Sequence, residues 1–123
     1  MKSISITYKG RGISLNDWYS GSHWSKRKKQ KDSMSEEMLT LFNKEGLSKV
    51  EWMDQFVVEM DYNSGFDPDN TIPMIKIAMD VLKGKIFKDD SRKYFKGYDT
   101  RYNPNLEKYT YVIRVSRWQQ EEK

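Results

Sequence analysis

Residues 55–62 read QFVVEMDY, and this stretch decides the fold class. Apolar and polar side chains alternate along it, so that Phe56, Val58, Met60 and Tyr62 share one face. A period of two is typical of a β-strand that buries one face in a core and leaves the other in solvent. We therefore expect a strand here, with the intervening acidic side chains at the surface.

A helical pattern follows this strand. It has Pro73 in its first turn and Gly84 just beyond its end, and both are typical helix boundaries. Between them, apolar side chains recur every three or four residues, which predicts one buried face. The charged residues Lys76, Asp80 and Lys83 are expected on the opposite face. The buried face is expected to comprise Ile75, Ala78, Met79 and Leu82.

Two further patterns lie upstream of the central strand and two lie downstream. Residues 3–8 alternate as a second half-buried strand, and residues 25–43 repeat apolar side chains at helical spacing. Downstream, an aromatic and basic segment runs to Tyr98, and residues 109–115 form a clear strand pattern. The order strand, helix, strand, helix, strand, strand predicts an α+β fold: a single domain over residues 1–123, with a mixed β-sheet and two packed helices.

The composition limits the chemistry of any site. The chain has no cysteine and a single histidine, His23, so it can build neither a disulfide nor a zinc site of the Cys/His type. Any metal is therefore expected to be a hard cation held by carboxylate and carbonyl oxygens. Mg²⁺ is favoured, with Mn²⁺ as the other option.

The charge and hydropathy of the chain indicate where it works. The formal net charge of +4 permits a polyanionic partner. No run of apolar residues reaches the ~20 needed to span a bilayer, and the N-terminus lacks the apolar stretch of a secretory signal. We therefore expect no membrane contact and a cytoplasmic location, which the absence of cysteine also fits.

Two acidic segments flank the helix that ends before Gly84. FDPDN precedes the helix and IFKDDSR follows it. Converging aspartates supply the charge that a hard divalent cation needs, and such an ion can polarise a phosphodiester and activate a water. Pro68 favours an extended backbone at Asp67, so the aspartates of the first segment can point the same way. The residues concerned are Asp67, Asp69, Asn70, Asp89 and Asp90.

The same acidic residues have a purely structural alternative. Short Asp and Asn side chains accept hydrogen bonds from free backbone amides, so DPDN is also good turn and helix N-cap chemistry. KDDSR can equally be a solvated turn. On spacing alone the structural role is the more frequent one, and the two segments meet only if a turn returns the chain along the helix.

The combination of FDPDN, KIAMD, LKG and FKDDS resembles the signature of the RusA family of Holliday junction resolvases. The resemblance covers roughly residues 67–92, and SLNDWYSGSHWSKRKKQKD is similar to the family's less specific N-terminal segment. It implies a small homodimeric, magnesium-dependent DNA endonuclease that resolves four-way junctions in recombination and repair. It also implies a bacterial or phage origin, branched DNA as the partner, and Asp67, Asp69 and Asp90 as catalytic, metal-binding acids.

The resemblance further implies a catalytic lysine at Lys76, which would stabilise negative charge on the phosphate. In the family this lysine usually lies four residues after the second acid, whereas Lys76 lies seven after Asp69. Its spacing to Asp80 is as expected, so we predict that the extra residues fall in the loop or first turn before the helix. The alternative role of Lys76 is an i, i+4 ion pair with Asp80 on the helix surface.

A basic run, SKRKKQK, begins the first predicted helix. A solvated helix end is the usual explanation of such a run, but beside a carboxylate site it also fits a track for DNA phosphates. Trp18 and Trp24 are expected to cap the core, and His23 is not expected to act as an acid or base. The candidate DNA-binding residues are Lys26, Arg27, Lys28, Lys29 and Lys31, with Arg92, Lys93, Lys96 and Arg101 as a second contribution.

Three functions follow from these patterns. We favour a metal-dependent, structure-selective endonuclease that cuts four-way DNA junctions. A catalytically silent junction or RNA binding module with the same fold is the first alternative, and the displaced lysine keeps it open. A nuclease that prefers flaps or replication forks is the second.

Overall fold

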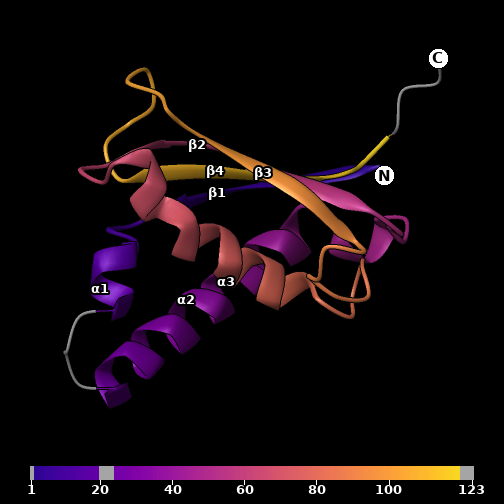
Figure 1. The fold of residues 1–123 in the computed structure, drawn as a ribbon, viewed down its shortest axis with the longest axis horizontal. Helices are drawn as coiled ribbons and strands as arrows, with labels where there is room; N and C mark the ends of the chain where they lie inside the picture. Colours follow the sequence, from indigo (N-terminus) through magenta and orange to yellow (C-terminus); the bar gives the residue numbers. More distant parts are fainter. Residues whose placement is uncertain (1, 20–23, 120–123) are drawn as a thin grey trace.

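Helices cover one face of a four-stranded sheet in this computed structural model (Figure 1). The structure describes residues 2–19 and 24–119. The elements, in chain order, are β1 (Ser3–Lys9), α1 (Leu15–Tyr19), α2 (Trp24–Lys44), η1 (Leu47–Lys49), β2 (Phe56–Asn63), η2 (Pro68–Thr71), α3 (Ile72–Leu82), β3 (Phe95–Tyr102) and β4 (Thr110–Arg117).

The sheet is mixed, with the strand order β1-β4-β2-β3. β4 pairs antiparallel with both β1 and β2, whereas β2 and β3 are parallel. A parallel pair needs a crossover connection, and α3 supplies it between β2 and β3. The chain is therefore a single α+β domain, as the order of sequence patterns predicted.

The core lies between the sheet and the helices. Along β2 every second side chain is buried, and Phe56, Val58, Met60 and Tyr62 are all inaccessible to solvent. The apolar side chains of β1 and β4 continue this surface across the sheet. From the helix side, α2 contributes Met34, Met38 and Phe42, and α3 contributes nearly all of its apolar residues.

Burial on this scale stabilises the fold strongly. Each large apolar side chain removed from water contributes about 1.5–3 kcal/mol to the free energy of unfolding. Phe56 and Phe87 stack with their ring centroids 3.8 Å apart, so the segment after α3 is fixed against β2. This anchor determines where the second acidic segment runs.

The predicted elements are present, but β3 extends to Tyr102, into the segment after Tyr98 that was predicted as a loop, and the sequence patterns missed α1. This short helix begins with a capping box, because the Ser14 hydroxyl accepts a hydrogen bond from the Asp17 amide at 3.1 Å. The reciprocal bond runs from the Ser14 amide to the Asp17 carboxylate at 3.4 Å. Trp18 packs against the core as expected. His23 and the Trp24 side chain lie outside the described part of the chain.

None of the helices in the described ranges combines the length and the apolar character needed to cross a bilayer.

Candidate functional site

The first acidic segment is held in place by the end of β2. The Tyr62 hydroxyl donates a hydrogen bond to the Phe66 carbonyl at 2.7 Å, which fixes the turn before Asp67. Asp67 has an extended backbone, with φ −69° and ψ 153°, as the following proline predicted. Its carbonyl then accepts the amide of Asn70 at 2.9 Å, and η2 leads directly into α3.

The carboxylates of this first segment are free. The Asp67 side chain makes no cap hydrogen bond, so the N-cap role that spacing alone favoured is wrong for this residue. Asp67 and Asp69 are both exposed, and neither carboxylate has a hydrogen bond or ion pair within residues 2–19 and 24–119. Their charge acts on Tyr62, whose pKa is raised first by burial and then by Asp67, with smaller contributions from Tyr111 and Asp69.

The second acidic segment folds back along α3. Gly84 allows the turn, because its φ of 80° lies in the left-handed region that favours glycine. Its amide donates to the Phe87 carbonyl at 2.7 Å, which closes the turn. Asp89 and Asp90 follow, and the Asp90 amide donates to the Asp89 carboxylate at 2.9 Å.

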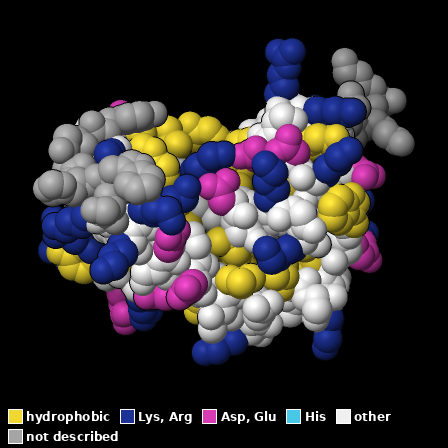
Figure 2. All heavy atoms as spheres, turned by 90° about the horizontal axis from the view of Figure 1, so that it is seen from below, with side chains coloured by type: hydrophobic (Ala, Val, Ile, Leu, Met, Phe, Trp, Pro, Cys, Tyr) yellow, Lys and Arg dark blue, Asp and Glu magenta, His cyan; other side chains and the backbone are white. Residues whose placement is uncertain are grey.

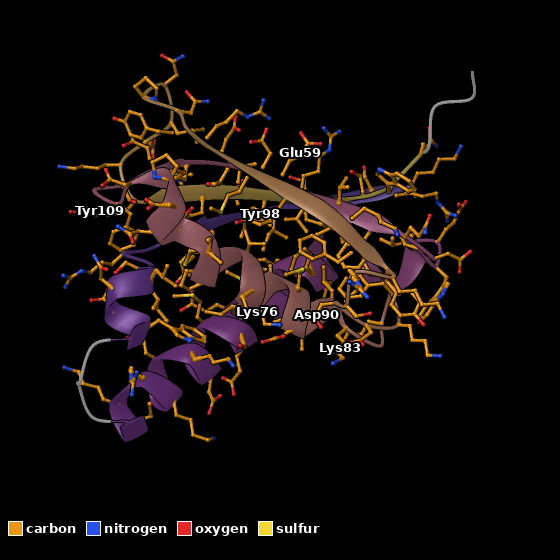
Figure 3. All side chains as sticks on the ribbon, in the orientation of Figure 1. Glu59, Lys76, Lys83, Asp90, Tyr98 and Tyr109 are labelled. Carbon is orange, nitrogen blue, oxygen red and sulfur yellow. The ribbon has the colours of Figure 1, made fainter. Side chains whose placement is uncertain are left out.

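Lysines of α3 neutralise this second segment. Lys76 donates a hydrogen bond to the Asp90 carboxylate, whose side chain is only 19% exposed (Figure 3). Lys83 pairs with Asp89 at 3.0 Å. The hydrogen bond to Asp90 is the main reason that the pKa of Lys76 is raised. The Lys83 hydrogen bond likewise lowers the pKa of Asp89 and raises that of Lys83.

Lys76 therefore lies beside a predicted site residue despite its longer spacing from Asp69. The i, i+4 contact with Asp80 is also present, at 3.6 Å, so one ammonium group lies between two carboxylates. The residues between Asn70 and Lys76 form the end of η2 and the first turn of α3.

The structure does not gather the predicted acids into one cluster. Within the part of the chain it describes, no three Asp, Glu or His residues lie in an arrangement that could hold a metal ion. Mg²⁺ needs fewer protein ligands than that, because it often binds through one or two carboxylates and keeps several waters. The free carboxylates of Asp67 and Asp69 fit this requirement, and the lysine-bound carboxylate of Asp90 does not in this arrangement.

A chain of charges joins the second segment to the basic helix α2. Asp80 forms an ion pair with a second lysine, Lys31, at 3.7 Å. The Lys31 ammonium also lies 5.3 Å from the centroid of the Trp18 ring. The charges thus alternate from α2 to the loop after α3, in the order Lys31, Asp80, Lys76, Asp90. Figure 2 looks at this helix side, where basic and acidic side chains are interleaved.

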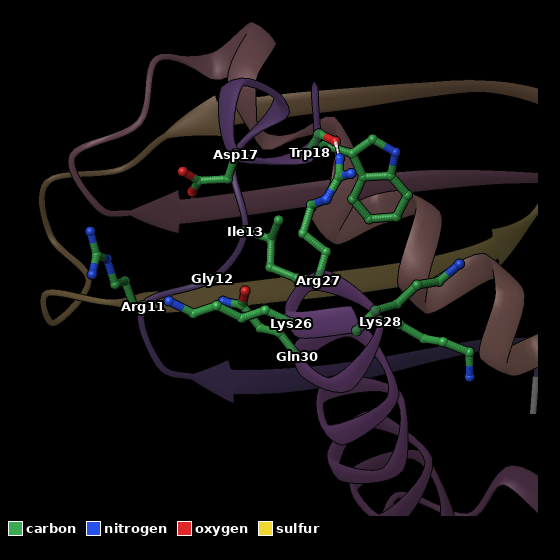
Figure 4. A pocket seen from close by; sticks show the side chains of 10 residues that line it. Arg11, Gly12, Ile13, Asp17, Trp18, Lys26, Arg27, Lys28 and Gln30 are labelled. Atoms are coloured by element: carbon green, nitrogen blue, oxygen red, sulfur yellow. Dashed lines mark hydrogen bonds between the residues drawn. The ribbon is translucent and has the colours of Figure 1, made fainter. Parts of the chain in front are cut away.

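A basic cavity of about 740 Å³ lies between the loop after β1, α1 and the start of α2 (Figure 4). The Arg27 guanidinium is fixed in its wall by a hydrogen bond to the Trp18 carbonyl. Asp17 is the acidic member of the lining, so cations dominate it. The basic residues of the lining are Arg11, Lys26, Arg27, Lys28 and Lys31.

The sequence patterns predicted most but not all of this basic surface. Lys29 is exposed but does not line the cavity, and the predicted contribution of Arg101 lies elsewhere, in ion pairs to acidic residues of β2 and β3. Arg11 was missed. The fold places it, because the Tyr111 hydroxyl donates to the Arg11 carbonyl at 3.0 Å. A Cβ atom at Gly12 would lie 2.6 Å from that hydroxyl, so glycine is required there.

No protein-family model matches the chain, and a search of curated proteins also gave no match. A functional proposal therefore depends on the chemistry of the residues and on the sequence resemblance of residues 67–92.

Proposed function

We propose that the protein is a magnesium-dependent, structure-selective DNA endonuclease that acts on four-way junctions as a homodimer. The observation that carries the proposal is the pair of exposed carboxylates at the head of α3, Asp67 and Asp69, which have no partner in the described part of the chain. Two carboxylates on a fixed backbone are suited to a hard cation, and the Asp67 side chain makes no cap hydrogen bond that would give it a structural role. The resemblance of residues 67–92 to the RusA family supports the choice of substrate.

In this proposal Asp67 and Asp69 hold Mg²⁺, with Asn70 in support. The ion supplies Lewis-acid chemistry at the scissile phosphate. Lys76 is charged at neutral pH, and the hydrogen bond to Asp90 raises its pKa further above the ordinary lysine value. A positive donor held in a fixed place stabilises the charge that develops on a phosphate oxygen. Asp90 orients that lysine and remains a predicted third ligand.

The basic cavity provides the affinity for DNA. Its lysine and arginine side chains neutralise phosphates, which releases condensed counterions and is independent of sequence. Lys31 belongs both to the cavity and to the charge chain that ends at Asp90. Lys31 thus places the DNA-binding surface of α2 in contact, through Asp80, with Lys76 on α3.

One observation favours the second candidate, a catalytically silent module that binds branched DNA or RNA. The Asp90 carboxylate is occupied by a lysine, and no three acids in the described residues can hold a metal together. Such a protein would use the same basic cavity and would need no metal.

One experiment separates these functions. A labelled four-way junction, a flap, a fork and a linear duplex of the same sequence are incubated with the protein, with and without Mg²⁺. The proposal expects cleavage of the junction only with Mg²⁺, and Asp69→Asn should bind the junction without cutting it. Asp54→Asn, which changes an exposed aspartate in the loop before β2, is the matched control. Tight binding with no cleavage by the unmodified protein would favour the silent module.

A further inference from the structure

We infer that β3 is the dimerisation edge of this protein and that it pairs antiparallel with β3 of a second copy, centred on Thr100. β3 is the last strand of the sheet, and no other strand in the described residues pairs with its outer edge. It is eight residues long and contains no proline. A long free edge of this kind is a ready template for another strand.

The backbone of β3 determines which residues can form the new pairs. In a parallel pair, alternate residues turn both their N–H and their C=O toward the neighbouring strand. The Asn103 amide donates to Tyr62 of β2 at 2.8 Å, so Asp99 and Arg101 share that orientation. Tyr98, Thr100 and Tyr102 therefore turn their backbone polar groups outward. These three residues must form the hydrogen-bonded pairs of any strand added at this edge.

The side chains favour a register centred on Thr100 over the symmetric registers centred on the residue before it or the residue after it. A pairing centred on Thr100 places Asp99 opposite the partner's Arg101, and Arg101 opposite the partner's Asp99. Centring on Asp99 would oppose two aspartates, and centring on Arg101 would oppose two arginines. Opposite charges directly across a strand pair stabilise it, and like charges destabilise it.

The register centred on Thr100 also fits the geometry of antiparallel pairs. The Asp99 and Arg101 pairs become the non-hydrogen-bonded type, in which the side chains approach most closely. Tyr98 and Tyr102 face each other across the interface on the helix side of the sheet. They are 48% and 52% exposed, which makes them among the most exposed large hydrophobic side chains of the described chain. Cross-strand aromatic pairs of this kind add stability.

Arg101 already lies beside carboxylates on the sheet face where it would pair with the partner's Asp99. Its guanidinium lies on the sheet face away from the helices, 3.4 Å from Asp61, 3.5 Å from Glu59 and 3.6 Å from Asp99. Three acidic side chains thus surround this one arginine at the edge of the sheet. Glu59, one of the three, is labelled in Figure 3. A planar guanidinium can bridge its own Asp61 and the partner's Asp99, because it offers several donors.

This pairing fixes the arrangement of the whole dimer. The two-fold axis runs perpendicular to the joined sheets, so the helices of both copies lie on the same side. Both basic cavities and both copies of α3 then face one surface. The inference deepens the dimer of the proposed function, but it does not depend on whether the protein cuts DNA.

A charge exchange tests the register. Sedimentation velocity should give a dimer for the unmodified protein and a monomer for Asp99→Arg or Arg101→Asp, since each variant opposes like charges twice. A mixture of the two variants should form a heterodimer, because each cross-strand pair then joins opposite charges again. Arg114→Asp is the matched control: Arg114 lies on the same sheet face in central β4, and this variant should remain dimeric.

A backbone variant tests the edge itself. Thr100→Pro removes an outward N–H without removing a bond to β2, and proline is tolerated at strand edges. It should weaken dimerisation at least tenfold, whereas Thr100→Val, which removes only the hydroxyl that bonds Thr71, should not. Thermal unfolding of each variant confirms that the monomers are folded.

The possible failures are distinguishable. A monomeric unmodified protein, or dimers that persist in both charge variants and in Thr100→Pro, would overturn the β3 interface. If junction cleavage continued in that case, the proposed function would stand. If the charge exchange behaved as expected but no junction were cut, the interface would stand without the nuclease.

Discussion

The two acidic segments at either end of α3 contain the same residue type in opposite electrostatic states. Asp67 and Asp69, at the head of the helix, are exposed and have no partner in the described chain. Asp89 and Asp90, beyond its end, are neutralised by Lys83 and Lys76. The carboxylates of the first segment are available to bind an external cation. Those of the second segment are already ion-paired with lysines of the same chain.

This difference shows that a carboxylate motif defines a candidate ligand set but not its availability. Whether a carboxylate is available to a cation depends on whether the fold places a lysine beside it. Here the lysines come from the middle and the end of α3. Among the described residues, none pairs with the carboxylates of the first segment, so a cation there displaces only water from them. A cation at Asp90 must also displace an ammonium group that is hydrogen-bonded to it.

The largest expected effect is at the free segment. Asp69→Asn should reduce junction cleavage by about a hundredfold or more, because it removes a ligand of the ion that polarises the phosphate. Binding of the junction should be retained or stronger, since a negative charge near phosphate is removed. Single-turnover cleavage and gel-shift assays measure the two quantities. A variant with full activity would remove Asp69 from the site.

Asp90→Asn sharpens the comparison between the segments. If Asp90 becomes a third ligand when DNA and metal bind, this variant should lose cleavage as completely as Asp69→Asn. If Asp90 only orients Lys76, the loss should be smaller and the Mg²⁺ concentration required for half-maximal cleavage should stay unchanged. A magnesium titration of both variants decides between these two roles.

The next effect concerns the lysines of the paired segment. Lys76→Ala should slow cleavage by roughly a hundredfold, which is typical for the loss of one preorganised donor at a transition state. Lys83→Ala removes a similar ion pair about two turns further along α3, at its C-cap, and it should leave the rate nearly unchanged. Single-turnover rates at saturating Mg²⁺ compare the two variants. A near-normal rate for Lys76→Ala would show that the lysine serves only to neutralise Asp90.

A smaller effect is expected at the basic cavity, which is joined to the paired segment through Lys31. Replacing Lys26, Lys28 and Lys31 by alanine should flatten the dependence of junction affinity on salt, by up to about 0.9 in slope for each DNA phosphate that is no longer neutralised. Lys29→Ala changes a neighbouring lysine outside the cavity and should alter the slope less. An unchanged slope in the triple variant would assign these lysines to ordinary solvation.

Much of the fold was predictable because its signals are local. The period of two in residues 55–62 and the Pro73 and Gly84 boundaries depend only on neighbouring residues, and β2 and α3 confirm both. The capping box at Ser14 was equally local, and α1 was missed although its signal was present. Strand order was not predictable, because it depends on contacts between distant residues.

The candidate site was predictable only in part, for the same reason. The extended backbone at Asp67 follows from Pro68, which is its direct neighbour. The hydrogen bond of Lys76 to Asp90 joins residues 14 apart and depends on the turn at Gly84 and on the stack of Phe87 against β2. Arg11 enters the cavity through a hydrogen bond with Tyr111, 100 residues away, which no local pattern contains.

The smallest effect tests how fully the lysines neutralise the second segment. The hydrogen bond from Lys83 lowers the pKa of Asp89, so the pair stabilises the folded state above the unfolded pKa of about 3.9 and loses this contribution as the pH falls through the folded pKa. Lys83 itself has a raised pKa, so the contribution is complete below about 10.4 and disappears as the pH rises through the folded value. The free energy of unfolding lost in Lys83→Ala should therefore be largest near neutral pH and shrink toward both extremes in urea titrations. Lys85→Ala removes a lysine whose hydrogen bond within the described residues is to the Val81 carbonyl, so its loss should not depend on pH in acid. A loss in Lys83→Ala that stays constant down to the acid limit would mean that Asp89 titrates as a free carboxylate, and the contrast between the two acidic segments would then rest on Lys76 and Asp90 alone.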